Sequence, residues 1–561
     1  MEGPPLQVPK MPRTPNSTKA RHLLLVVLIS AAVIAPAMVV GIPSNRDLYS
    51  HFRLALPFYD AFRTGDFYPG WLAESNSGYG DASFRFYPPG FHQLIAGLRL
   101  ISGNWYLATL LVFTLLSVLG SLGVYFWARE FISSRNAVWA SVFYAIAPYH
   151  LNQLYQAFLL PEYAGAAVLP FLFVFVERVC RRRSPRDIGL AVSYVVLVFT
   201  HLPLTVNASI AMAVYAVVRL ERDNKLSTLA RLVLAIVLGL AASASYWTTM
   251  ATELKWIRAD NIEPEPSVNY RLNFLLSTFS PENLNVWWMN ILLLSSLAMF
   301  WPALGYFWSS GLAAKSEFSV AAIRGLKATT VVLVLTLFMA TPLSLPVWNL
   351  LPVLQATQFP WRWLLITSVV ASVLLAAAIP SWEHALRIGR RKLVLVAAGT
   401  MAISLAFSIA HTVREAQWLT RPEFEQILKE LRGSQGSPQW WPVWVKEPIR
   451  EMNLPVKAGD RELKVTSWFP EFRMFELGPG SAAEARIRTF FYPHWKAEAN
   501  GQSLAVRPDS DGALVISVPV NAVSVSLKFE EPVRVWVARA IGLVGWILIG
   551  LLLVIKSGLK R

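Results

Sequence analysis

Residues 363–381 read WLLITSVVASVLLAAAIPS, a run without a charged side chain. A helix of this length can cross the hydrocarbon core of a bilayer, which is about 30 Å thick. Water would not solvate such a surface, and in lipid only a helix or a closed barrel satisfies the backbone hydrogen-bonding groups. The run therefore predicts a membrane-spanning helix.

Similar apolar blocks recur along the whole chain. Hydrophobic residues make up 54% of the sequence and charged residues 15%, and the mean hydropathy of +0.43 lies outside the range of soluble proteins. We predict a mostly α, polytopic membrane protein of about twelve transmembrane helices, and we expect the first block to be a retained span because no cleavage motif follows it. The expected spans lie near residues 21–42, 105–127, 137–149, 164–178, 189–201, 203–218, 229–250, 290–312, 328–346, 363–381, 393–410 and 534–555.

The net charge of +16 is concentrated in short clusters between the apolar blocks. The two largest clusters, Arg178–Arg186 and Arg387–Lys392, are separated by an even number of spans, so the positive-inside rule places both in the cytoplasm. This orientation places both termini inside. Contact with anionic lipid explains the clusters, and we expect no nucleic-acid partner.

Three segments are then long enough to form outer structures: 43–104, 251–289 and 411–533. The third differs from the others because apolar and polar residues alternate in four stretches, with Asn500-Gly501 and Asp511-Gly512 as turn signals. We expect four parts of the chain, the third being a small antiparallel β-sandwich. They are a cytoplasmic tail (1–21), a transmembrane core with the first outer loop (22–410), an extracytoplasmic β-rich domain (411–533) and a last helix with a basic cytoplasmic tail (534–561).

Several kinds of chemistry are excluded by missing motifs. The sequence has no phosphate-cradling glycine loop, dinucleotide fingerprint or paired-histidine metalloprotease motif. Its one cysteine, Cys180, rules out an intrachain disulfide and a cysteine-based metal site, and we interpret it as an inert thiol. These absences leave no site for a nucleotide cofactor, and a divalent metal ion stays open as an alternative.

The first outer loop holds the densest group of ionisable residues. If the segment from Asp47 to His51 is helical, the two side chains share one face. A carboxylate just outside the membrane suits a general base, but Asp47 could equally stabilise the first turn of an interfacial helix. Other acids of this loop are expected to order it, although any of them is an alternative base: Asp60, Asp66, Glu74 and Asp81.

Arg362 is the second candidate, within Gln358-Phe-Pro-Trp-Arg-Trp363 at the outer end of a predicted span. A guanidinium at that depth can bind a lipid phosphate with two hydrogen bonds. The alternative is an interfacial anchor, with Arg362 stacked on Trp361 or Trp363. Both interpretations stay open.

Two further candidates flank short outer loops. Glu162, which follows His150 in the chain, could orient a sugar hydroxyl, bind a divalent metal ion or cap the next span. His201, with Pro203, interrupts an apolar run, and a kink with an internal hydrogen bond is the simpler interpretation than a ligand.

Several of these motifs resemble known families. The acid soon after the first span, followed by a loop rich in Gly, Trp, Tyr and Pro, resembles the GT-C superfamily of polyprenyl-phosphate-dependent glycosyltransferases. Other segments are similar to bacterial 6-pyruvoyl-tetrahydropterin synthase-related membrane proteins, akin to the YfhO-like proteins. These segments are Phe67–Leu72, Gly78–Gly80, Phe86–Pro89, Glu162, Gln358–Trp363 and Tyr492–Trp495 with Asn500-Gly501.

The GT-C resemblance implies transfer of a sugar from a polyprenyl-phosphate donor to an unknown glycan, lipid or protein acceptor at the outer face of a bacterial cytoplasmic membrane. Asp47, with His51, would be catalytic, and Arg362, Gln358 and Trp361 would hold the donor phosphate. The sugar or acceptor would contact Glu162, His150, Tyr79 and Asp81. The alternatives are a transporter or flippase of lipid-linked sugars, and a non-catalytic assembly protein of the same fold.

Overall fold

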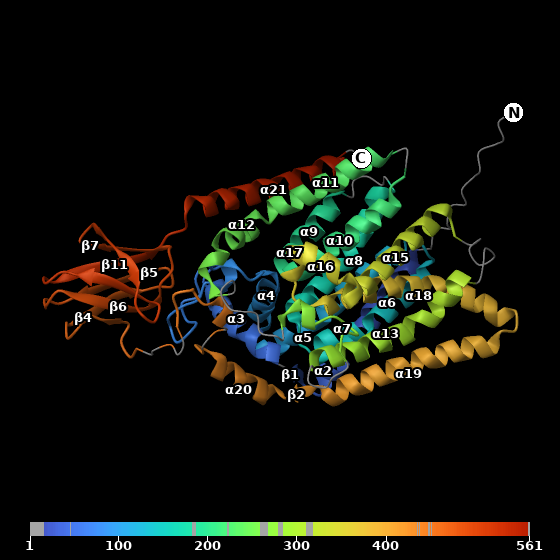
Figure 1. The fold of residues 1–561 in the computed structure, drawn as a ribbon, viewed down its shortest axis with the longest axis horizontal. Helices are drawn as coiled ribbons and strands as arrows, with labels where there is room; N and C mark the ends of the chain where they lie inside the picture. Colours follow the sequence, from blue (N-terminus) through green and yellow to red (C-terminus); the bar gives the residue numbers. More distant parts are fainter. Residues whose placement is uncertain are drawn as a thin grey trace.

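The computed structural model describes residues 16–44, 46–181, 187–221, 224–258, 268–278, 284–309, 318–434, 436, 438–446, 449 and 452–558. It consists of a large helical body with a β-sandwich at one end (Figure 1). This arrangement confirms the predicted fold class. Some of the basic residues from which the orientation was predicted lie outside the described residues, among them Lys10, Arg13 and those within 182–186.

Each of the twelve predicted spans falls on helical chain, but eight described helices are long and apolar enough to cross a membrane. In the predicted spans near 21–42, 137–149 and 189–201, the helices are too short to count among these eight. The predicted span near 290–312 falls on α13, whose described apolar part is also short. The helices are α1 Asn16–Ala32, α2 Ala35–Val39, α3 Arg46–Phe62, α4 Gly90–Ser102, α5 Trp105–Ala128, α6 Ser134–Ala145, α7 Pro148–Tyr155, α8 Leu160–Cys180, α9 Asp187–Thr200, α10 Leu202–Arg219, α11 Lys225–Ala242, α12 Ala244–Glu253, α13 Leu284–Ser309, α15 Val320–Ala340, α16 Leu345–Leu350, α17 Pro352–Gln355, α18 Trp363–Arg387, α19 Arg391–Glu415, α20 Arg421–Leu431 and α21 Val533–Gly558.

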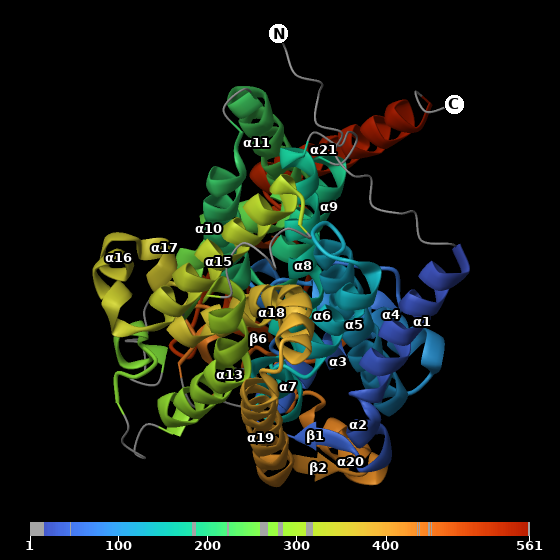
Figure 2. The ribbon, with the colours of Figure 1, turned by 90° about the vertical axis from the view of Figure 1, so that its right-hand side faces the viewer.

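Helix α18 lies at the centre of the body, surrounded by α5, α6, α13 and α15 (Figure 2). It is the most buried of the candidate spans. Its faces carry small residues, among them Ser368, Ala371, Ser372 and Ala376, which allow neighbouring helices to approach closely. The segment that leads into its N-terminus therefore enters a crowded region of the protein.

An outer layer, formed by a two-stranded sheet and α20, covers one side of the helical body. Strand β1 (Ile42–Ser44) pairs antiparallel with β2 (Gln417–Leu419), and Phe424 of α20 packs edge-on against Phe52 of α3 with ring centroids 5.1 Å apart. The chain after α19 thus first joins the outer loop of the N-terminal region. The strands of the sandwich begin only at Val456, later than the start of the predicted domain at 411.

The sandwich consists of two antiparallel sheets with strand orders β3-β6-β10-β9 and β4-β5-β11-β7-β8. Asn500 (φ 49°) and Gly501 (φ 80°) form the turn between β7 and β8, with positive φ angles as a type I′ hairpin requires. This confirms the predicted hairpin. The strands are β3 Val456–Lys457, β4 Leu463–Trp468, β5 Phe472–Leu477, β6 Ala483–Phe490, β7 Trp495–Ala499, β8 Gln502–Leu504, β9 Val506–Pro508, β10 Ala513–Val518 and β11 Val523–Phe529.

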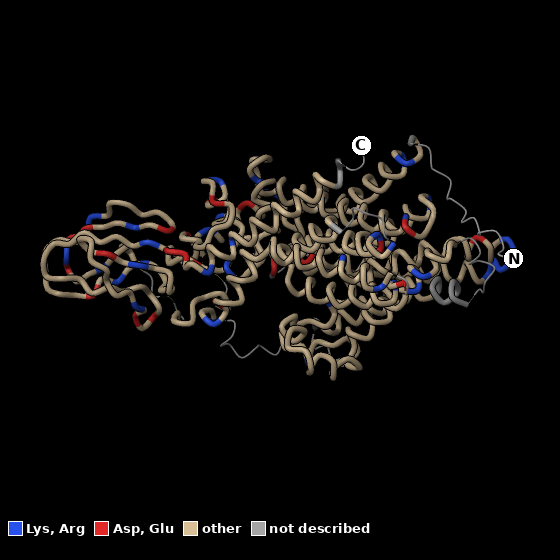
Figure 3. The backbone as a smooth tube through the Cα atoms, turned by 90° about the horizontal axis from the view of Figure 1, so that it is seen from above, with Lys and Arg blue, Asp and Glu red and all other residues tan. Residues whose placement is uncertain are grey.

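A buried ionic cluster joins the sandwich to the helices. Arg85 of the first outer loop donates to Glu253 at the end of α12 at 2.6 Å and to Glu531, just before α21, at 2.8 Å. Tyr492 of the sandwich donates to Glu253 at 2.7 Å. Figure 3 shows charged residues on the sandwich and at this junction, while the middle of the helical body carries few. The cluster fixes the sandwich against the outer loop.

Candidate functional site

An ion pair between Glu162 and Arg362 forms the centre of the candidate site. Glu162 lies in the first turn of α8, and Arg362 ends the short 3₁₀ helix Pro360–Arg362 that leads into α18. The guanidinium Nε donates to Glu162 Oε2 at 3.0 Å, and the two side chains are 12% and 2% exposed. Such a buried pair holds its geometry because separating it would leave an uncompensated charge.

The other oxygen of Glu162 is held by α7. Tyr149 donates its hydroxyl to Oε1 at 2.8 Å, and Gln153 donates Nε2 to the same atom at 2.9 Å. His201, the N-cap of α10, lies with its Nε2 4.0 Å from Glu162 Oε2. With these partners the carboxylate orients Arg362 and is poorly placed to bind a metal ion.

The loop before α18 sets the position of Arg362. Its Nη1 donates to the carbonyl of Thr357 at 2.6 Å, and its guanidinium lies 4.7 Å from the ring centre of Phe359. Trp361 stacks on the same ring at 4.3 Å. The alternative interpretation placed Arg362 against Trp361 or Trp363, whereas the cation–π partner in the structure is Phe359. The side chain of Gln358 is exposed, and its φ of 65° turns the chain toward the site.

Asp47 lies in the first turn of α3, which is helical from Arg46 as the spacing to His51 requires. Burial raises the pKa of Asp47 to about 6, the positive charge of Arg362 lowers it, and the negative charge of Glu162 raises it. Both charges act on this carboxyl only because the three residues are close together. Asp47 and Arg362 line neither of the two cavities described in this structure.

His51 is buried beside Asp47 on the same helix. Burial lowers the pKa of His51 to about 3, so the ring is neutral at physiological pH. Its ring lies 6.0 Å from Phe91 and 6.5 Å from His92, and Nε2 makes no hydrogen bond to a described residue. The neutral ring packs beside Phe91 and His92 of α4 and does not supply a positive charge to Asp47.

Other predicted site residues lie elsewhere. His150 is buried between the rings of Tyr144, at 4.4 Å, and Tyr163, at 4.9 Å. Its neighbours Tyr149 and Gln153, which sequence reasoning missed, make the contacts to Glu162 instead. The signal for them was their spacing of four residues on a short polar helix.

Tyr79 and Asp81 are not brought into the site. Tyr79 stacks on Phe490 of the sandwich at 5.1 Å, and Asp81 is buried and accepts hydrogen bonds from Ser83 and Asn76. Asp81 orders the first outer loop, because a buried carboxylate must satisfy its oxygens locally. Tyr79 docks the same loop to the sandwich.

Tyr87 is a further residue that the sequence did not single out. It follows Phe86 in the proline-rich part of the first outer loop, and burial and the charge of Asp47 raise its pKa while Arg362 lowers it. Its hydroxyl therefore stays protonated close to both candidate residues. Within the described part of the chain, no group of three or more His, Cys, Asp or Glu side chains is suited to a metal ion.

The fold and the site define a polytopic helical membrane protein with a buried carboxylate–guanidinium cluster outside its central helix. The chain belongs to the family of membrane proteins with a 6-pyruvoyl-tetrahydropterin synthase related domain, whose sequence profile matches residues 84–419. No curated protein sequence matches the chain.

Two solved structures are similar at low identity. ArnT from Cupriavidus metallidurans bound to undecaprenyl phosphate shares 12% identity with a TM-score of 0.40, covering 74% of this chain and 76% of that one. The Archaeoglobus fulgidus oligosaccharyltransferase in the apo form shares 14% identity with a TM-score of 0.32, covering 75% of this chain and 57% of that one.

Proposed function

We propose that this protein is an inverting membrane glycosyltransferase of the GT-C type, which transfers a sugar from a polyprenyl-phosphate donor at the outer face of a bacterial cytoplasmic membrane. The observation that carries the proposal is the position of Asp47, a carboxyl with a pKa of about 6, under the influence of the Arg362–Glu162 pair. The motif resemblance to GT-C enzymes supports the choice of donor.

The chemistry follows from the protonation state of Asp47. With a pKa of about 6 this carboxyl is mostly ionised at neutral pH and is more basic than an ordinary aspartate. The acceptor hydroxyl gives its proton to Asp47 while its oxygen attacks the anomeric carbon. The bond from that carbon to the phosphate oxygen breaks, and the electron pair leaves with the polyprenyl phosphate.

Arg362 stabilises the leaving phosphate. Its Nε and Nη1 are held by Glu162 and Thr357, and Nη2 makes no hydrogen bond to another described residue. A guanidinium held in this way can donate to a phosphate oxygen without reorienting. The side chain of Gln358, four residues away along the chain, is exposed, and in this proposal it contacts the donor as well.

The test uses purified full-length protein in liposomes, a panel of decaprenyl-phosphate hexoses with radiolabelled sugar, and cell-envelope extract as the acceptor source. Wild type should transfer label from at least one donor. Asp47→Asn keeps the shape but removes the base, so transfer should fall about 10²- to 10⁴-fold while donor binding persists.

The matched control is Asp60→Asn, the same substitution on the same helix. Asp60 pairs with Arg432 at 2.7 Å at the surface and lies outside the cluster, so near-normal transfer is expected. Near-normal transfer by Asp47→Asn would remove Asp47 as the base. Absence of transfer by wild type with every donor would count against the enzyme and favour a transporter or an assembly protein.

A further inference from the structure

A second polar site lies on the C-terminal helix, between α21 and the first outer loop. It is a cavity of about 380 Å³, within the size range of small-ligand pockets. Its walls come from the loop, from the ends of α9 and α11, from the start of α12 and from α21. The lining residues are Asp66, Tyr68, Phe199, Ala242, Ser245, Arg539, Gly542, Leu543 and Trp546.

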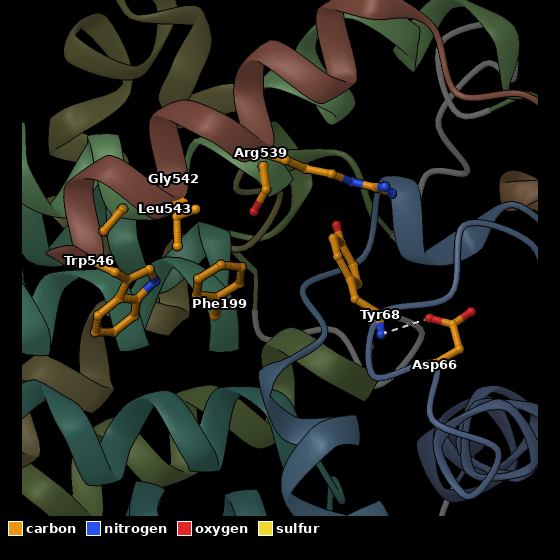
Figure 4. A pocket seen from close by; sticks show the side chains of 9 residues that line it. Asp66, Tyr68, Phe199, Arg539, Gly542, Leu543 and Trp546 are labelled. Carbon is orange, nitrogen blue, oxygen red and sulfur yellow. Dashed lines mark hydrogen bonds between the residues drawn. The ribbon is translucent and has the colours of Figure 1, made fainter.

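The cavity is polar at one end and apolar at the other. Figure 4 shows Asp66, Tyr68 and the guanidinium of Arg539 together at one end, and Phe199, Leu543 and Trp546 at the other. Leu543 and Trp546 are 63% and 43% exposed on a helix that is apolar enough to span the membrane. The apolar end therefore opens toward lipid, and an occupant with a charged head and a hydrocarbon tail fits this gradient.

Arg539 and Asp66, at the polar end, can each form a further hydrogen bond to a ligand. Glu531 Oε1 accepts from Arg85 at 2.8 Å and from Arg539 at 3.2 Å, so Arg539 makes the longer of two bonds to one oxygen. Asp66 accepts from the backbone N–H of Tyr68 through Oδ1, and Oδ2 makes no hydrogen bond to another described residue. Burial raises the pKa of Asp66, and the backbone N–H of Tyr68 and the positive charge of Arg539 oppose that rise, so Asp66 and Arg539 interact.

A cation and an anion side by side are complementary to a zwitterion. We propose that this cavity binds the headgroup of an aminophospholipid, with its phosphate on Arg539, its primary ammonium on Asp66 and its acyl chains along Leu543 and Trp546. This site is separate from the Asp47 cluster and does not depend on the proposed transfer reaction. A trimethylammonium group cannot donate to Asp66, and a glycerol headgroup carries no cation for it.

The test is native mass spectrometry of the delipidated full-length protein, titrated with phosphatidylethanolamine, phosphatidylcholine and phosphatidylglycerol of identical acyl chains. One phosphatidylethanolamine should bind about tenfold more tightly than either other lipid, the difference that one extra charge-assisted hydrogen bond supplies. Soluble phosphoethanolamine at the same concentration should not displace it, because the apolar wall contributes to binding. Displacement by the soluble headgroup would overturn the assignment to a lipid.

Variants place the binding in this cavity. Asp66→Asn keeps the oxygen that accepts from Tyr68 and should lower phosphatidylethanolamine binding to the phosphatidylcholine level, leaving phosphatidylcholine unchanged. Gly550→Phe lies on the same helix outside the cavity lining, with nothing within 4 Å of a Cβ placed there, and should bind like wild type, whereas Gly542→Phe fills the cavity and should abolish tight binding.

Size-exclusion profiles and thermal denaturation establish that each variant is folded before its binding is compared. A folded Gly542→Phe variant that keeps the tight site would overturn the proposal. Equal binding of the three lipids by wild type would overturn it as well, because the pair of opposite charges would then confer no selectivity.

Discussion

Two carboxylates interact with Arg362, but only Glu162 forms a bonded pair with it. Glu162 accepts hydrogen bonds from Arg362, Tyr149 and Gln153, so its charge is fully compensated. Among the described residues Asp47 has no such set of donors, and burial raises its pKa to about 6. The difference between the two acids follows from their partners: the first orients a cation, and the second is suited to take a proton.

The proton affinity of Asp47 predicts a pH profile. Burial raises the folded-state pKa above the ordinary value, so the basic form is lost as pH falls through about 6. Transfer should reach a plateau above pH 7 and drop about tenfold from it at pH 5, the fraction expected for one group. A profile of kcat/KM against pH measures this, and a flat profile between pH 5 and 8 would exclude Asp47 as the titrating base.

Arg362 should not tolerate lysine. Arg362 uses two nitrogens within the protein: Nε donates to Glu162 and Nη1 donates to Thr357. In Arg362→Lys, the lysine keeps the positive charge but has a single nitrogen, which cannot make both bonds and also bind a phosphate. We expect a higher KM for the donor and a kcat lower by about tenfold or more. Steady-state kinetics separate the two effects.

Arg421→Lys is the matched control, since Arg421 forms an exposed pair with Glu425 on α20 and should leave both constants unchanged. Unchanged constants in Arg362→Lys as well would refute a role for the planar guanidinium.

At the scale of elements, the two-stranded sheet of β1 and β2 ties the first outer loop to the chain after α19. Ile42 pairs with Leu419, and the preceding Gly41 approaches the partner strand closely. Gly41 has φ of 143°, and a Cβ placed there would lie 2.3 Å from the carbonyl oxygen of Leu419. Strand β1 ends at Ser44 and α3 begins at Arg46, so this sheet sets where the helix that carries Asp47 begins.

Gly41→Ala should destabilise the outer layer. The side chain needs both an unfavourable φ and displacement of a backbone carbonyl, at a cost of about 1 to 3 kcal/mol. Gly65→Ala is the control, because Gly65 also has positive φ (97°) but has nothing within 4 Å of its Cβ position. The apparent Tm of Gly41→Ala should fall further than that of Gly65→Ala, and equal shifts would show that the close approach to Leu419 adds no cost.

At the scale of the whole molecule, the sandwich lies at one end of the helical body, and α21 begins shortly after its last strand, β11 (Figure 1). The ionic cluster of Arg85, Glu253 and Glu531 fixes this arrangement. If the sandwich is outside, the first outer loop, which Arg85 ties to it, is outside too.

The orientation can be tested with single cysteines, because the chain contains only Cys180. In a Cys180→Ala background, Gln502→Cys on the exposed hairpin should react with a membrane-impermeant maleimide in intact cells, and Ser17→Cys at the start of α1 only after permeabilisation. The reverse pattern would place the candidate base in the cytoplasm, where the proposed donor chemistry would not occur.

The sequence by itself determined the local structure of this protein. Apolar runs gave helices at all twelve predicted blocks, and Asn500-Gly501 gave the hairpin, because each depends on residues close together in the chain. Span lengths were less accurate, since a proline or a histidine can end a helix within an apolar run.

Only the tertiary structure decided which side chains meet. Glu162 and Arg362 are 200 residues apart, and Ile42 pairs with Leu419 across most of the chain. Tyr79 packs against the sandwich and His150 is buried between tyrosines, although both were predicted to bind the sugar or the acceptor. These outcomes depend on how the helices pack around α18, and hydropathy and spacing within one segment carry no information about that packing.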